Sequence, residues 1–132
     1  MAKNSVFISY DYNNDKASKE QLLGWDANKE IDFSSYDQPL SVAVDSDEAE
    51  VIKKEIADRI GAARYFLSMV GKDSYRNGWA AWQTRKAAEL NKKLVAVKID
   101  SINEPPAALQ RAGATWTMMF TFDFIKTAIA AV

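Results

Sequence analysis

The feature that most constrains the fold is a regular alternation of short apolar runs with longer stretches of helical periodicity. The short runs predict strands at residues 6–10, 31–36, 64–70, 94–99 and 115–120. The longer stretches predict helices at residues 15–25, 48–61, 77–92, 105–113 and 123–132. Strands that alternate with helices join through right-handed crossovers, which give a mostly parallel sheet with helices on both faces. The expected fold is therefore α/β and flavodoxin-like, with five strands.

Size and composition indicate one domain spanning residues 1–132. Hydrophobic residues make up 48% of the chain, which is enough for a core. The net charge of −1 lacks the basic excess of a general nucleic-acid binder. No segment approaches the roughly 20 apolar residues that cross a bilayer, and residues 1–4 run directly into the first strand without room for a signal peptide. We therefore expect a cytoplasmic location, without nucleic-acid or membrane partners.

Two reactive residue types are missing, because the chain contains neither cysteine nor histidine. This excludes disulfides, thiolate nucleophiles, imidazole acid–base chemistry and the usual zinc sites, so no metal site is expected. The glycine-rich phosphate-binding motifs GxGxxG and GxxxxGK[ST] are also missing. Any chemistry must therefore use carboxylates, hydroxyls, amides or lysines.

The predicted helix at residues 48–61 shows the clearest amphipathic pattern. Ile52, Ile56 and Ile60 recur at every fourth residue and form one buried stripe. Ser46 or Asp47 is expected to cap the start of this helix, and Gly61 to end it.

The helix after the third predicted strand carries the main candidate residue, Gln83. Four residues spaced four, four and three apart share one face of this helix, namely Trp79, Gln83, Ala87 and Leu90. Three of the four are apolar, so this face should turn toward the sheet. Gln83 either hydrogen-bonds nearby backbone, the interpretation that the residues alone favour, or points into a cleft. Trp79 and Trp82 are more often core residues, but they are compatible with stacking on a nicotinamide or adenine ring.

Polar residues follow the first two predicted strands. Ser9, Tyr10 and Asp11 end the first strand, and ligands of open α/β sheets bind beyond the carboxyl ends of strands. The alternative is an ordinary polar turn in which Asp15 caps the next helix, and the residues alone favour this turn.

The second strand, which contains Ser34, leads into a polar loop at residues 38–47. Asp37 and Asp45 flank or lie in this loop and could bind ribose hydroxyls. The alternative is a solvated loop without a ligand.

The chain resembles TIR domains through five segments that occur in matching order and spacing. These segments are VFISYDY, IDFSSYD, ARYFLSMVG, GWAAWQ and KKLVAVKI. They are most similar to the compact bacterial TIR-like proteins of Thoeris-type phage defence. The resemblance covers essentially the whole chain, and its specificity lies in the ordered combination rather than in one motif.

The resemblance implies an enzyme that cleaves the bond between nicotinamide and ribose in NAD. NAD is then the substrate, and no separate cofactor is implied. The product is nicotinamide together with ADP-ribose or a cyclic or conjugated derivative, which signals to a separate effector. Self-association is a further expectation from this family.

By position, the resemblance gives each candidate residue a role. Gln83 occupies the place of the catalytic glutamate, and Trp79 lines the nicotinamide side. Tyr10 and Asp11 lie at the first-strand end of the pocket, and Asp37 starts the loop that gates it. Glutamine keeps the shape of glutamate but lacks its charge, so we expect a site that binds NAD and breaks the bond poorly. An engineered Glu→Gln exchange, which the intact surroundings favour, and a natural pseudoenzyme both fit.

Two other functions compete with this interpretation. A TIR adaptor that acts only through self-association and partner binding needs no catalytic glutamate, so Gln83 favours it. Trp79, the polar end of the first strand and the compact length count against it. A phospho-acceptor receiver domain is rejected, because the third strand ends in Ser68-Met69-Val70-Gly71 and the fifth in Met119-Phe120, without the required aspartate and lysine.

Overall fold

The computed structural model describes residues 4–117 and 119–132. Five strands form one parallel sheet in the order β2-β1-β3-β4-β5, which confirms the predicted fold class. The strands are β1 (Asn4–Ser9), β2 (Ile31–Ser35), β3 (Tyr65–Val70), β4 (Lys93–Lys98) and β5 (Thr115–Trp116). Residues 1–3, in the predicted lead-in to the first strand, and residue 118, in the predicted fifth strand, lie outside the described residues.

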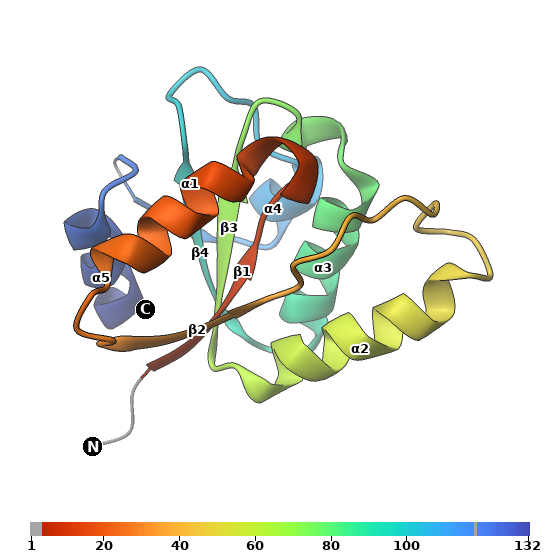
Figure 1. Cartoon of the computed structure of the whole chain (residues 1–132), viewed down its shortest axis with the longest axis horizontal. Coiled ribbons are helices and arrows are strands. Elements are labelled where there is room, and N and C mark those ends of the chain that lie inside the picture. Colours follow the sequence, from red (N-terminus) through yellow and green to blue (C-terminus); the bar gives the residue numbers. More distant parts are fainter. Residues whose placement is uncertain (1–3, 118) are drawn as a thin grey trace.

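Helices cover both faces of the sheet (Figure 1). The helices are α1 (Tyr12–Trp25), α2 (Ala49–Ala62), α3 (Gly78–Glu89), α4 (Ala107–Arg111) and α5 (Phe122–Ala131), with a short 3-10 turn η1 (Ser74–Arg76) before α3. Helices α1 and α5 lie on one face, and α2, α3 and α4 on the other. In the described part of the chain, no helix is long and apolar enough to cross a membrane.

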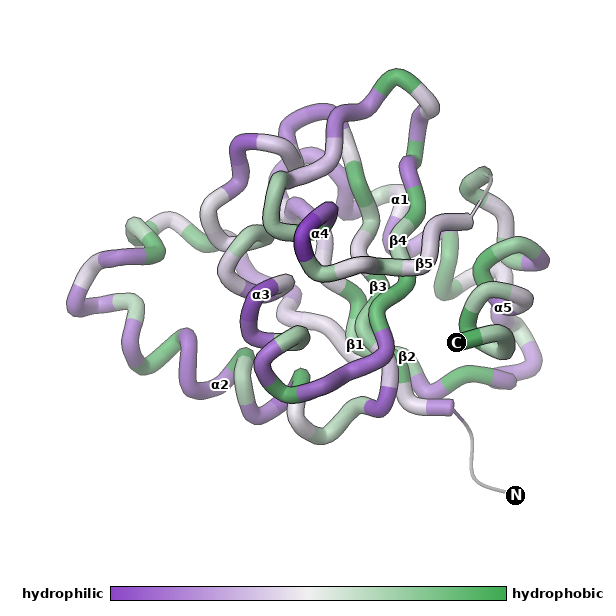
Figure 2. The backbone as a smooth tube through the Cα atoms, turned by 180° about the vertical axis from the view of Figure 1, so that it is seen from behind, coloured by the Kyte–Doolittle hydropathy of each residue, from purple (hydrophilic) through white to green (hydrophobic). Residues whose placement is uncertain are grey.

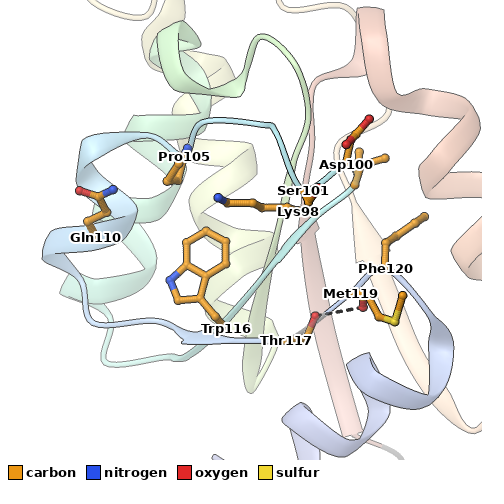
Figure 3. Close-up of a pocket in the computed structure, with 10 residues that line it drawn as sticks. Lys98, Asp100, Ser101, Pro105, Gln110, Trp116, Thr117, Met119 and Phe120 are labelled. Atoms are coloured by element: carbon orange, nitrogen blue, oxygen red, sulfur yellow. Dashed lines mark hydrogen bonds between the residues drawn. The ribbon is translucent and has the colours of Figure 1, made fainter.

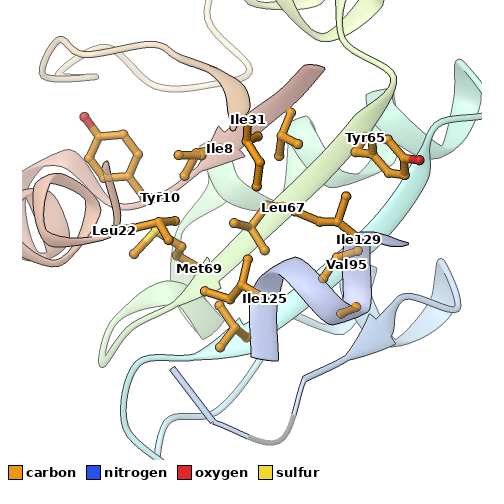
Figure 4. Close-up of a cluster of buried hydrophobic side chains, with 13 residues drawn as sticks. Ile8, Tyr10, Leu22, Ile31, Tyr65, Leu67, Met69, Val95, Ile125 and Ile129 are labelled. Carbon is orange, nitrogen blue, oxygen red and sulfur yellow. The ribbon is translucent and has the colours of Figure 1, made fainter. Parts of the chain in front are cut away.

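The core on the α1 and α5 face follows from strand alternation. Val6, Ile8 and Tyr10 point to this face, because successive residues of a strand alternate between the two faces. They pack with side chains from β3 and β4 and with Leu22 of α1 and Ile125 of α5 (Figure 4).

The opposite face holds a second core beneath α2 and α3. Phe7 of β1 and Phe66 of β3 are neighbours in register and stack with ring centroids 6.0 Å apart. Ile56 and Ile60 of α2 are fully buried against them and Ile52 is partly buried, so the predicted stripe faces the sheet. Hydrophobic residues accordingly gather in the central strands, while hydrophobic and hydrophilic residues alternate along α2 (Figure 2).

The structure corrects the predicted caps. Helix α1 begins at Tyr12 and is capped by Asp11, whose carboxylate accepts a hydrogen bond from the backbone N–H of Asn13. Asp15 therefore lies inside the helix and caps nothing. Helix α2 is preceded by Glu48 without a side-chain cap, and its last residue lies beyond the predicted Gly61.

Helices α3 and α4 (Ala107–Arg111) and strand β5 are shorter than the predicted elements. Helix α3 ends at Glu89, because Asn91 adopts a left-handed backbone with φ of 59°, a common helix-terminating conformation. Leu90 therefore does not continue the buried face and is 40% exposed. In the described part of the chain, strand β5 pairs through Thr115 and Trp116 alone, against Val95 and Ala96 of β4.

Candidate functional site

A small cavity lies beyond the carboxyl end of β1 and beside the first turns of α1 and α3. Its volume is about 50 Å³. The lining residues come from three segments of the chain and are Tyr10, Asp11, Tyr12, Asn13, Leu40, Asn77, Trp79, Ala80 and Gln83. This position, beyond the end of a central parallel strand, is where open α/β sheets bind ligands.

Gln83 is held in this cavity by a side chain rather than by backbone. The hydroxyl of Ser9 donates a 2.6 Å hydrogen bond to Oε1 of Gln83, and the two residues are 2% and 4% exposed. The interpretation that Gln83 hydrogen-bonds nearby backbone is therefore wrong, because its partner is the side chain of Ser9. A carbonyl oxygen or a carboxylate can accept this bond equally, so the geometry suits either side chain at this position.

Helix α3 presents Gln83 because its first turn is tightly anchored. The side chain of Asn77 accepts hydrogen bonds from the backbone N–H groups of Trp79 and Ala80 at 3.0 and 3.1 Å, a strong N-cap. The indole N–H of Trp79 donates to the carbonyl of Val42 at 2.9 Å. Trp79 therefore lines the cavity and also ties down the loop between β2 and α2.

Asp37 lies at the start of that loop, two residues after the end of β2. Its Oδ1 accepts hydrogen bonds from Tyr10 at 2.5 Å and from Ser35 at 2.7 Å, and forms an ion pair with Lys19 at 3.1 Å. Partial burial raises the pKa of Asp37, but the bonds from Tyr10, Ser35 and Lys19 outweigh it and the pKa lies below its ordinary value. Burial and the bond to Asp37 raise the pKa of Tyr10, so it stays a neutral donor.

A second buried carboxylate, Asp15, lies one turn beyond Asp11. It is 7% exposed, and its Oδ2 has no hydrogen-bond partner in residues 4–117 and 119–132. It packs directly on Gly71, where an added Cβ would lie 2.0 Å from Oδ2. Burial, with the carboxylates of Asp11 and Asp73, raises the pKa of Asp15 to about 6, although the Lys72 ammonium lowers it.

We expect Asp15→Asn to stabilise the protein at pH 7.5 by about 1–2 kcal/mol. The pKa of Asp15 is higher in the folded state, so its contribution to stability is complete below about pH 4 and is lost as pH rises through about 6. Urea unfolding at pH 4.5, 6 and 7.5 measures this change. The same exchange at the exposed Asp58 is the control, and an Asp15→Asn variant with an unchanged pH profile would contradict the prediction.

The structure brings some predicted site residues together and separates others. The predicted residues that line the cavity are Tyr10, Asp11, Trp79 and Gln83. Ser9 lies outside the lining and donates a hydrogen bond to Gln83. Asp37 lies next to the cavity and accepts a hydrogen bond from the hydroxyl of Tyr10.

Three predicted residues lie elsewhere. Ser34 does not line the cavity, because strand alternation places its neighbour Ser35 against Asp37 instead. Asp45 is exposed in the loop before α2. Trp82 packs toward α2 and contacts Trp79 edge-on at 5.9 Å, with Lys53 over its ring.

Among the lining residues that sequence reasoning did not assign to the site, Asn77 and Leu40 differ in whether the sequence carried a signal for them. Asn77 stands directly before the predicted helix turn and has the residue type of an N-cap, which was a usable signal. Leu40 is an apolar residue within a polar loop, and its contact with the cavity depends on how that loop folds back. Among the described residues, no group of three or more acidic side chains could hold a metal ion.

Residues 7–104 match the family described as Thoeris protein ThsB, TIR-like domain. The chain belongs to this ThsB TIR-like family. The match covers most of the chain and confirms the resemblance drawn from the sequence segments. A comparison with curated proteins gives no match.

Solved structures show that the ThsB TIR-like chain shares its fold with several proteins of low sequence identity. The CMP N-glycosidase BcmB of Clostridium botulinum is 12% identical with a TM-score of 0.62, over 98% of this chain and 100% of that chain. A 2-deoxyribosyltransferase of Bacillus psychrosaccharolyticus is 16% identical with a TM-score of 0.59, over 94% and 90%. The TIR domains of the Roq1 resistosome are 16% identical with a TM-score of 0.55, over 84% and 69%.

Proposed function

We propose that this chain is an NAD-binding TIR protein of anti-phage defence whose bond-cleaving step is disabled by Gln83. The observation that carries the proposal is the buried position of Gln83 in the cavity beside β1, together with the family match. With a glutamate at this position, the reaction would release nicotinamide and form ADP-ribose or a derivative of it. That product would act on a separate effector.

The chemistry requires negative charge at this point. Breaking the bond between C1′ of the ribose and N1 of nicotinamide transfers the bonding electrons to the pyridinium nitrogen, and positive charge develops on the ribose. A water oxygen then bonds to C1′ and its proton passes to solvent. A fixed carboxylate at position 83 would stabilise the developing charge. In a water-poor pocket this stabilisation of the transition state would amount to roughly 3 kcal/mol or more.

Gln83 can bind without performing this step. Its Oε1 already accepts the bond from Ser9, and its amide can hydrogen-bond a ribose hydroxyl. The amide carries no charge, so the electrostatic stabilisation is lost while the shape is kept. Asp11 supplies a carboxylate to the same cavity, but its oxygens already accept bonds from Asn13 and Asn14.

Ligand entry requires the loop between β2 and α2 to move. A cavity of about 50 Å³ is far smaller than a typical ligand pocket, and Leu40 of this loop forms part of its wall. The loop is held by the bonds of Tyr10 to Asp37 and of Trp79 to Val42. We propose that NAD binds when these contacts release, and that self-association assists this opening.

A non-catalytic adaptor is the second candidate. The neutral Gln83, whose Oε1 already accepts a hydrogen bond from Ser9 in a cavity of about 50 Å³, favours a protein that acts through TIR–TIR or partner contacts.

Calorimetry with NAD, and chromatography of nicotinamide at high protein concentration, separate these candidates. We expect measurable NAD binding without nicotinamide release above background. Trp79→Ala should weaken NAD binding about tenfold or more, since ring stacking contributes roughly 1–3 kcal/mol. Trp82→Ala is the matched control on the same helix and should change affinity less than threefold.

Thermal melts verify that both tryptophan variants fold. Absence of NAD binding to the unmodified chain, even with lysate from phage-infected cells, would leave the adaptor as the better account.

A further inference from the structure

A second and larger cleft lies beyond the carboxyl ends of β4 and β5. It encloses about 790 Å³ and shares no lining residue with the Gln83 cavity. Its walls come from the end of β4, the following loop, α4, β5 and the segment after it. The volume falls in the usual range of small-molecule sites.

Strand register explains how this cleft acquires an aromatic surface and a positive charge together. Trp116 of β5 is the register partner of Ala96 in β4, so the two side chains share one face of the sheet. Lys98 lies two residues after Ala96 and therefore points to the same face. Ala96 has only a Cβ, which leaves room for the indole, and β5 is an edge strand of the sheet that the described residues form.

The side chains adopt the arrangement that this register predicts. The ammonium of Lys98 lies 5.9 Å from the centroid of the Trp116 ring, and in Figure 3 its side chain extends over the indole. Trp116 remains 38% exposed, which is unusual for the largest apolar side chain. Gln110 of α4 and Pro105 lie beyond the ammonium end of the Lys98 side chain in the same view.

The electrostatics of the cleft favour an anion. In residues 4–117 and 119–132, no carboxylate forms an ion pair with Lys98. Asp100 lies at the opposite end of the group drawn in Figure 3, and one of its oxygens accepts a 3.3 Å bond from the backbone N–H of Ile102. Lysine is a common phosphate ligand as a point charge.

We propose that this cleft binds a nucleoside phosphate, with the base against Trp116 and the phosphate at Lys98. A planar base suits an exposed indole, and the phosphate suits an ammonium without a carboxylate partner. The amide of Gln110 and the hydroxyl of Ser101 provide hydrogen-bonding groups for the base edge or the ribose. Gln110 and Trp116 lie beyond the family match at residues 7–104, so the site uses side chains outside that match.

The test is a titration with AMP, followed by the indole N–H resonances in ¹⁵N–¹H spectra, with the Trp116 resonance assigned from a Trp116→Phe variant. Saturating AMP should shift the Trp116 resonance and leave that of Trp79 in place. Adenosine, which lacks the phosphate, should bind roughly tenfold more weakly than AMP.

Variants of the two anchors separate the contributions of base and phosphate. Lys98→Gln should weaken AMP roughly tenfold without changing adenosine, and Lys98→Arg should restore AMP binding. Trp116→Ala should weaken both ligands at least about fivefold, whereas Trp116→Phe should retain binding and so guards against misfolding. Three results would overturn the proposal: no shift at Trp116, a shift confined to Trp79, or AMP affinity indifferent to both Lys98→Gln and Trp116→Ala.

Discussion

The Gln83→Glu variant is expected to release nicotinamide from NAD at least about 100-fold faster than the chain with Gln83. The side chain keeps its place, because the Ser9 hydroxyl that donates to Oε1 at 2.6 Å can donate equally to a carboxylate. The new charge faces the cavity into which the proposed substrate enters. Chromatography of nicotinamide at high protein concentration measures the change, and calorimetry gives NAD affinity separately.

Rate and affinity should respond differently to this exchange. A carboxylate that stabilises charge developing on the ribose raises the rate, while NAD affinity changes little. In the Gln83→Glu background, Glu89→Gln should leave the rate unchanged, since Glu89 is exposed on the same helix and pairs with Lys86 at 3.3 Å. Gln83→Asn, which stays neutral, should give no gain. A Gln83→Glu protein that binds NAD yet releases no nicotinamide would contradict the catalytic assignment of position 83.

The second large effect concerns stability, and we expect Phe66→Ala to reduce the free energy of unfolding by about 3–5 kcal/mol. Phe66 is fully buried in the central strand β3 and stacks on Phe7 beneath α2 and α3. Its removal leaves a cavity between the sheet and two helices that cannot easily close around it. Urea unfolding followed by circular dichroism measures the loss.

The matched control is Phe124→Ala, the same chemical change at a partly exposed position of α5. It should cost less than about 1.5 kcal/mol, because Phe124 is already 37% exposed and its removal leaves no enclosed cavity. Similar losses in the two variants would show that the core beneath α2 and α3 is looser than its packing indicates.

Much of the fold follows from local patterns in the sequence. The continuous apolar run of β3 and the four-residue spacing of Ile52, Ile56 and Ile60 each report a secondary structure and its buried face without reference to the rest of the chain. The same reasoning placed Trp79 and Gln83 on the inward face of α3. Boundaries were less accurate where capping decides them, as at Asp11 and Asn91.

The sequence by itself determined the alternation of strands and helices, the family, and the glutamine at the position of interest, because all three are carried by residue type and spacing along the chain. Only the tertiary structure decided what surrounds that glutamine. Ser9 and Gln83 are separated by 74 positions along the chain. Their hydrogen bond exists because the carboxyl end of β1 lies next to α3. The burial of Asp15 against Gly71 and the pairing of Lys98 with Trp116 likewise depend on strand order and register, which are set by packing between distant segments.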